Sequence, residues 1–318
     1  MRYLSLLFFV IIIISCTKTP VPELENIEFL ESSISPHQIG KDEDSSIFIN
    51  YNNIILEHKK NRNALFSYDK YEEFLITLNK SDRFIFVPLN EFDQTYSSDK
   101  IVIGMRHDVD YDIASAMRMA RREYRNGVRA TYYFLNTAEY YSDNKISTEI
   151  RKPYVLDYMN KLQNEYKHEI GWHNDLVTLQ IVYNVDVEKY LTKELAYLRN
   201  NGIRVEGSAY HGSEFCYIYH YLNFYIWKPA SNHIETGPSW GLFQNFDSVG
   251  INGVYKKIKK FDFSDFGFKY EADLLKKNYF FADVFYFNNK RWNMTMFDWN
   301  SLKPGDRVIV LTHPALWD

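Results

Sequence analysis

The sequence predicts an α/β fold built on a parallel sheet of barrel type, and three observations point to it. Short apolar segments with strand character alternate with segments of helical periodicity, an order typical of parallel βαβ units. The patterned part, from about residue 66 to residue 318, has about 250 residues, the size of a (β/α) barrel. Titratable residues repeatedly follow the predicted strands, where active sites lie in barrels and in open sheets.

The predicted elements follow one another regularly over most of this region. Apolar residues at helical spacing indicate the helices, and glycines at 127 and 202 mark the ends of two of them. The predicted helices are 68–79, 113–126, 153–166 and 185–201, and the predicted strands are 84–87, 101–105 running into 106–110, 129–135, 169–172, 205–210 and 307–312. The segment from about 217 to 279 is too irregular for an assignment.

The first residues resemble a bacterial lipoprotein signal. Arg2 precedes an apolar run over residues 4–14 that is broken only by Ser5. A helix of this length rises only about 16 Å, too little to span a bilayer. Cys16 then follows the small residue Ser15, as in lipoproteins whose cysteine is lipidated. We expect a signal peptide over 1–15, a polar tether over 16–63 and a barrel domain over 64–318. The alternative is a cleaved secretory signal with an incidental cysteine.

This expectation places the protein outside the cytoplasm, anchored to a bacterial membrane through lipidated Cys16, in the periplasm or on the outer surface. The formal net charge is −4 and the sequence pI is about 6.2, which excludes a general nucleic-acid-binding surface. Two cysteines cannot build a disulfide scaffold. With Cys16 lipidated, Cys216 has no partner, and we interpret it as a structural thiol.

The predicted strand ends carry the residues with the clearest chemistry. Arg106, Asp108 and Asp110 are two residues apart, so a strand that continues this far points all three to one face. One carboxylate can then bind a cation while the other serves as a base, although a structural salt bridge is the alternative. His173, His211 and His313 end other predicted strands, and one Asp with two His is a familiar ligand set for a catalytic metal.

Four motifs in this order resemble the polysaccharide deacetylases of the NodB-homology type, in the bacterial branch that opens with Arg-His-Asp-Val-Asp. The similarity runs from about residue 67 to the C-terminus. It implies a distorted (β/α)7 barrel with its site at the carboxyl ends of the strands, a divalent metal, usually zinc, and removal of N-acetyl or O-acetyl groups from an acetylated poly- or oligosaccharide. The motifs are Met105–Asp112, Gly127–Phe134, His168–His173 and Leu311–Pro314.

The resemblance also implies roles for single residues. Asp108 matches the catalytic base, Asp110 and His173 match metal ligands, and His313 matches the general acid. The second histidine of the family's His-x3-His motif would fall at Val177, which cannot bind a metal. The third ligand is then His211, Asp175 or water, and we favour His211 because a separate strand end can approach the metal from another side.

Three supporting residues follow from the same resemblance. The arginine that orients the base is absent from the strand that ends at His211, and Arg106 is the substitute candidate. Asp283 and Trp292 stand where the family has an Asp and a Trp that support the acid and the acetyl pocket.

Two other functions compete with a deacetylase. Because Val177 replaces a ligand, the domain could be a degenerate barrel that binds a surface glycan without hydrolysing it. A glycosidase with Asp108 and Asp110 as its acid–base pair ranks lower. These carboxylates leave one strand in parallel, whereas a glycosidase needs them on opposite sides of a bond.

Overall fold

The computed structural model describes residues 66–317, except for 95, 97, 150, 214, 217, 218, 220, 233–235, 238–240, 243–246, 252, 285, 288 and 289. The chain divides into two units at residues 64 and 65, and the described residues belong to the second. The expected signal peptide, Cys16 and the tether lie outside them. Within the described part of the chain, no helix is long and apolar enough to cross a membrane.

The four predicted helices and the six predicted strands lie close to their expected positions, whereas the short helix at 176–181 and the strands at 270–271 and 279–282 were not predicted. The described residues of the unassigned middle form short pieces. The α-helices are α3 (Tyr68–Asn79), α4 (Ile113–Arg125), α5 (Tyr154–Asn160), α6 (Leu176–Ile181) and α7 (Val187–Asn200). The main strands are β1 (Phe84–Val87), β2 (Ile101–Val109), β3 (Thr131–Leu135), β4 (Glu169–Asn174), β5 (Val205–Tyr210), β10 (Tyr270–Glu271), β11 (Tyr279–Ala282) and β14 (Arg307–Thr312). The short antiparallel pairs are β6 (Thr236–Gly237) with β7 (Gly241–Leu242), β8 (Ser248–Ile251) with β9 (Val254–Lys257), and β12 (Tyr286–Phe287) with β13 (Lys290–Arg291).

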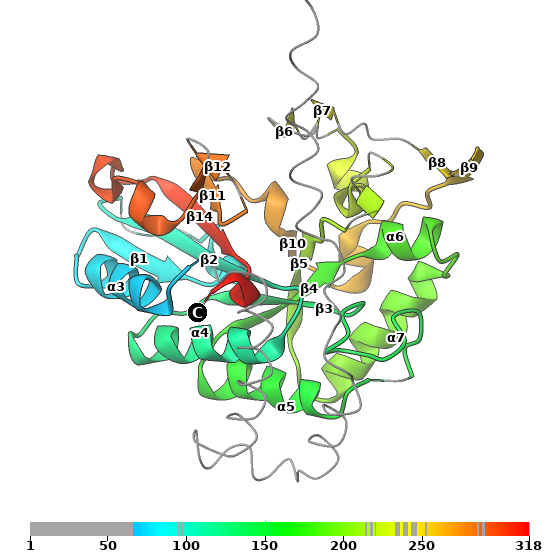
Figure 1. Ribbon diagram of the computed structural model, residues 1–318, viewed down its shortest axis with the longest axis horizontal. Helices are drawn as coiled ribbons and strands as arrows, with labels where there is room; N and C mark the ends of the chain where they lie inside the picture. Colours follow the sequence, from blue (N-terminus) through cyan, green and yellow to red (C-terminus); the bar gives the residue numbers. More distant parts are fainter. Residues whose placement is uncertain are drawn as a thin grey trace, which may run out of the picture. The chain divides into compact units, whose positions relative to one another are not determined.

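One eight-stranded sheet forms the centre of the fold, and all of its pairs are parallel, as the sequence predicts. Its spatial order is β10-β5-β4-β3-β2-β14-β11, with β1 beside the first half of β2. The sheet curls like part of a barrel (Figure 1). In the described residues β10 and β11 end the row and do not pair with each other, so the wall is open there.

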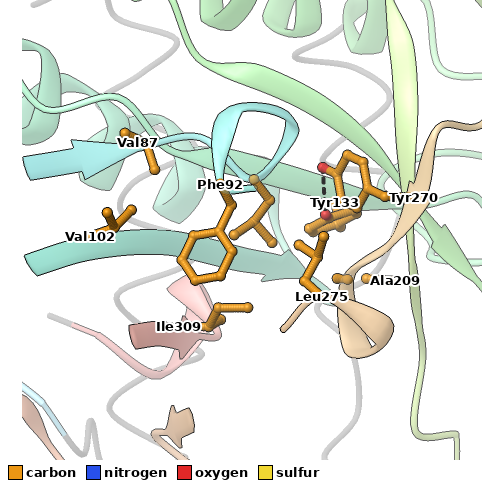
Figure 2. Close-up of a cluster of buried hydrophobic side chains, with 10 residues drawn as sticks. Val87, Phe92, Val102, Tyr133, Ala209, Tyr270, Leu275 and Ile309 are labelled. Carbon is orange, nitrogen blue, oxygen red and sulfur yellow. Dashed lines mark hydrogen bonds between the residues drawn. The ribbon is translucent and has the colours of Figure 1, made fainter. Parts of the chain in front are cut away.

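A hydrophobic cluster fills the concave side of this sheet, as Figure 2 shows. Its side chains come from strands that are distant in the row, including Val102 of β2, Ala209 of β5, Tyr270 of β10 and Ile309 of β14. The turn of 3-10 helix at Leu89–Glu91 and the following Phe92 pack into it from one end. The sheet therefore wraps around a packed core, as in a (β/α) barrel.

The alternation of side chains along β2 places the site above this core. Because β2 extends to Val109, Arg106 and Asp108 share the inner face with Val102, as predicted for a strand that continues this far. His107 points to the outer side, where its ring bonds Glu123 of α4 (2.7 Å) and Thr312 of β14 (2.6 Å). The polar side chains on the inner face of β2 therefore lie between the hydrophobic core and the carboxyl ends of the strands.

Candidate metal and catalytic site

Three predicted ligands meet at the carboxyl ends of three strands of the sheet. Asp110 directly follows β2, His173 lies in β4 and His211 directly follows β5. One candidate ligand atom from each lies within 4.8 Å of the other two. Asp110 Oδ1 is 3.1 Å from His173 Nε2 and 3.5 Å from His211 Nδ1. We call these three residues the ligand triad.

The ligand triad has the properties of a cation site. Asp110 Oδ1 is buried, yet no hydrogen-bond partner reaches it within the described residues. Burial opposes ionisation of Asp110, but the imidazoles of His211 and His173 hold its pKa well below the usual range. His173 uses Nδ1 to bond the Ala209 carbonyl (3.0 Å), which leaves Nε2 facing Asp110. One carboxylate and two imidazoles fit a zinc ion or a similar divalent transition metal.

Asp108 is held by Arg106 beside the ligand triad. The Arg106 guanidinium donates from Nε and Nη2 to both oxygens of Asp108, each at 2.8 Å. Both side chains are almost fully buried, and Asp108 Oδ2 lies 3.6 Å from His173 Nε2. Burial by itself would raise the pKa of Asp108, but the charges of Arg106 and His173 lower it. Asp108 is therefore an ionised carboxylate that accepts hydrogen bonds in a fixed orientation.

His313 adjoins the ligand triad from β14. Its Nε2 lies 3.8 Å from Asp110 Oδ2, while its Nδ1 bonds Asp283 Oδ1 at 2.7 Å. Asp283 is fully buried and also accepts from the His313 backbone N–H (2.7 Å) and from Trp317 Nε1 (2.9 Å). Burial would lower the pKa of His313, but the Asp283 carboxylate raises it to about 9. Nε2 of His313 thus faces the triad, and the Asp283 carboxylate favours the protonated form of the imidazole.

Two predicted site residues have other surroundings. Asp175 is not in the ligand triad, because its oxygens accept from Thr137 Oγ1 (2.8 Å) and Asn223 Nδ2 (3.0 Å). Trp292 stacks on Phe281 at 4.9 Å within an aromatic cluster beside β11. The tryptophan that donates to the carboxylate that holds His313 is Trp317.

Val177 and Cys216 are both buried and neither belongs to the ligand triad. Val177 is fully buried in α6, and His211 occupies the third corner of the triad. Cys216 is buried, and burial raises the pKa of its thiol to about 12, which agrees with the predicted structural thiol.

Sequence reasoning missed three supporting residues. Asp273, in the short segment after β10, accepts a 3.0 Å bond from Arg106 Nη1. Trp317 holds Asp283, and Asn223 bonds the backbone of His211 at 2.8 Å. Asp273 and Asn223 lie in the segment without periodicity, and Trp317 lies beyond the last motif. No motif or periodicity in the sequence identifies these residues.

Comparisons with models of protein families, with curated proteins and with solved structures found no significant match for this chain.

Proposed function

We propose that this protein is a metal-dependent hydrolase that removes acetyl groups, N-acetyl groups in the first place, from a cell-envelope or exported glycan. The observation that carries the proposal is one arrangement of charges. An arginine-held carboxylate (Asp108) and a carboxylate-held histidine (His313) both adjoin the ligand triad. That set is what acetyl hydrolysis with a proton acceptor and a proton donor requires.

The proposal also includes the type of fold. We assign the sheet to the distorted (β/α)7 type of the polysaccharide deacetylases that the sequence resembles. Support comes from the strand order, because β2, β3, β4, β5 and β10 are spatial neighbours in chain order and β11 and β14 lie on the other side of β2. Only the step from β10 to β11 lacks a pairing in the described residues.

Asp110, His173 and His211 would hold the metal, for which zinc is our proposal. When bound, such an ion polarises the substrate carbonyl and lowers the pKa of water. Asp108 accepts the proton of the attacking water, because Arg106 holds its carboxylate ionised and oriented. Hydrolysis then breaks the acetyl C–N bond, and the water oxygen leaves in acetate.

His313 completes this reaction as the proton donor. Its Nδ1 faces Asp283, so Nε2 is the nitrogen that can protonate the departing amine. An amine is a poor leaving group until it is protonated, which is why an amide substrate needs this residue. Asp283 keeps the imidazole oriented and favours its protonated form.

The test uses the full-length protein loaded with zinc and freed of excess metal. We expect about one zinc per chain and acetate release from at least one member of a panel of N-acetylated and O-acetylated glycans. Zinc binding without acetate release from any of them would overturn the hydrolase. Glycan binding in the absence of zinc and of turnover would instead support the non-catalytic glycan-binding protein.

The proposed location has its own test. Cys16 lies outside the described residues, and lipidation would attach the chain to a membrane. We expect Cys16→Ser to move the protein from the membrane fraction to the soluble fraction after cell fractionation. Membrane association that persists in this variant would refute the lipoprotein interpretation.

A further inference from the structure

Asn223 is a fully buried amide behind the third ligand of the triad. It begins the turn of 3-10 helix at Asn223–Ile226, in the segment for which the sequence predicts no element. Its side-chain Nδ2 donates to the backbone carbonyl of His211 at 2.8 Å and to Asp175 Oδ1 at 3.0 Å. Its Oδ1 accepts from the backbone N–H of Thr178 at 3.1 Å. Asn223 therefore joins the loop after β5 to the first turn of α6.

The backbone of His211 is held by a hydrogen bond on each side of its Cα atom. His173 lies within β4, and Asp110 directly follows a nine-residue strand. His211 lies just past the end of β5, and its side chain is 17% exposed. Its backbone N–H donates to Asn174 O at 2.8 Å, and its carbonyl accepts from Asn223. These two bonds fix the peptide groups on both sides of the His211 Cα atom.

The contacts of Asn223 also explain how α6 contributes to this site. Val177 of α6 carries no ligand atom, but its neighbours Asp175 and Thr178 hold the two ends of the Asn223 amide. Asp175 is itself fixed by Thr137 Oγ1 at 2.8 Å. The start of α6 thus supports a ligand on the next strand and does not supply one.

We infer that Asn223 is a positioning residue for the metal site, which holds His211 in place as the third ligand through its backbone carbonyl. This inference rests on the metal-binding part of the proposed function. Outer-shell partners of metal ligands typically contribute about 10–100-fold to metal affinity. We expect an effect of this size from Asn223 although it does not contact the metal position.

The test is zinc titration of the full-length protein, with cobalt absorption spectra as a second readout of ligand geometry. We expect Asn223→Ala to weaken zinc binding about 10–100-fold and to change the visible bands of the cobalt form. Asn223→Ser is the milder variant if the alanine variant does not fold. Gln163→Ala is the matched control. It removes a buried amide that bonds the Gly202 carbonyl (3.0 Å) and the Arg204 backbone N–H (2.7 Å) before β5, at the opposite end of this strand from His211.

A double-mutant cycle separates positioning from general stability. In the His211→Ala background, Asn223→Ala should cause no further loss of zinc affinity, because the residue through which it acts is gone. A further loss in that background, or an equal loss in Gln163→Ala, would overturn the inference. A wild-type protein that binds no zinc would overturn the proposed metal site itself. Unchanged affinity in both Asn223 variants would overturn only the role of Asn223.

Discussion

Asp108 and Asp110 are two residues apart on one strand, and their partners give them different chemistry. Asp108 is bonded twice by a guanidinium, whereas Asp110 faces two imidazole nitrogens and has a buried oxygen without a hydrogen bond in the described residues. Arg106 also donates to Asp273, so a single buried cation serves two carboxylates. The two aspartates therefore differ in chemistry because their charged partners differ, although they are the same type of residue.

This difference predicts separable effects of the two carboxylates. Asp108→Asn should lower acetate release by about 100- to 10,000-fold and leave zinc content unchanged, because it removes a base and not a ligand. Elemental analysis and an acetate assay of the same preparation measure both. The matched variant Asp110→Asn should lose the metal. Loss of metal from Asp108→Asn would show that Asp108 is a ligand.

The third corner of the triad gives a second prediction at this scale. His211→Ala should lose most bound zinc, because Asp110 and His173 alone leave the ion with two protein ligands. Asp175→Ala is the comparison, since the oxygens of Asp175 bond Thr137 and Asn223. Elemental analysis in which His211→Ala keeps full occupancy and Asp175→Ala does not would reverse this assignment.

Among the secondary-structure elements, β2 contributes residues both to the candidate site and to the hydrophobic core. Its second half carries Arg106 and Asp108, and its first half packs on the segment after β1. Gly104 makes this packing possible, because a Cβ atom there would lie 2.6 Å from Leu89 Cδ2 and 2.8 Å from Phe92 Cδ2. The absence of a side chain at one position thus lets the core approach the strand that carries Asp108.

We therefore expect Gly104→Ala to lower the free energy of unfolding by about 1–3 kcal/mol through overpacking. Chemical denaturation measures it. In a Leu89→Ala background, Gly104→Ala should cost less than it does in the wild type, because the shortened side chain leaves room for the new methyl group. Gly250→Ala, where the nearest atom would lie 3.4 Å away, is the control and should change little. Equal stability of Gly104→Ala and wild type would mean that the core can shift to admit the methyl group.

In the molecule as a whole, the interior of the curled sheet holds a buried carboxyl group, that of Glu169. Glu169 accepts from the Asn90 N–H (2.9 Å), Thr131 Oγ1 (2.7 Å) and Tyr270 Oη (2.8 Å). Burial raises its pKa from 4.5 to about 7 in spite of these bonds. The folded protein therefore holds this proton at pH values where the unfolded chain has released it.

The sign of the resulting pH dependence follows from linkage. Protonated Glu169 contributes stability that is fully present below pH 4.5 and is lost as the pH rises through about 7. The shift corresponds to about 3 kcal/mol. Glu169→Gln imitates the protonated form, so its free energy of unfolding relative to wild type should increase between pH 5 and pH 8. Denaturation curves at several pH values measure this, and parallel pH profiles of the two proteins would contradict it.

The local features of this chain could be predicted from the sequence alone. Apolar periodicity and end signals place α3 at 68–79 and β14 at 307–312 as the structure has them, because they act within a few residues. Alternation along β2 correctly predicts that Asp108 shares a face with Arg106 and that His107 points away. The gathering of the strand-end histidines could also be predicted, because parallel strands bring their carboxyl ends to one edge of the sheet.

Which of these residues are partners depends on the tertiary structure. Strand-end reasoning favoured His211 over Asp175, but its place in the triad depends on how β5 and α6 lie beside β4. The bond from Arg106 to Asp273 joins residues 167 positions apart, and Trp317 and Asn223 likewise act across the chain, on Asp283 and His211. No local pattern encodes contacts of this kind. Local patterns predict the elements and the residues at their ends, whereas the packing of distant segments selects the partners that orient those residues.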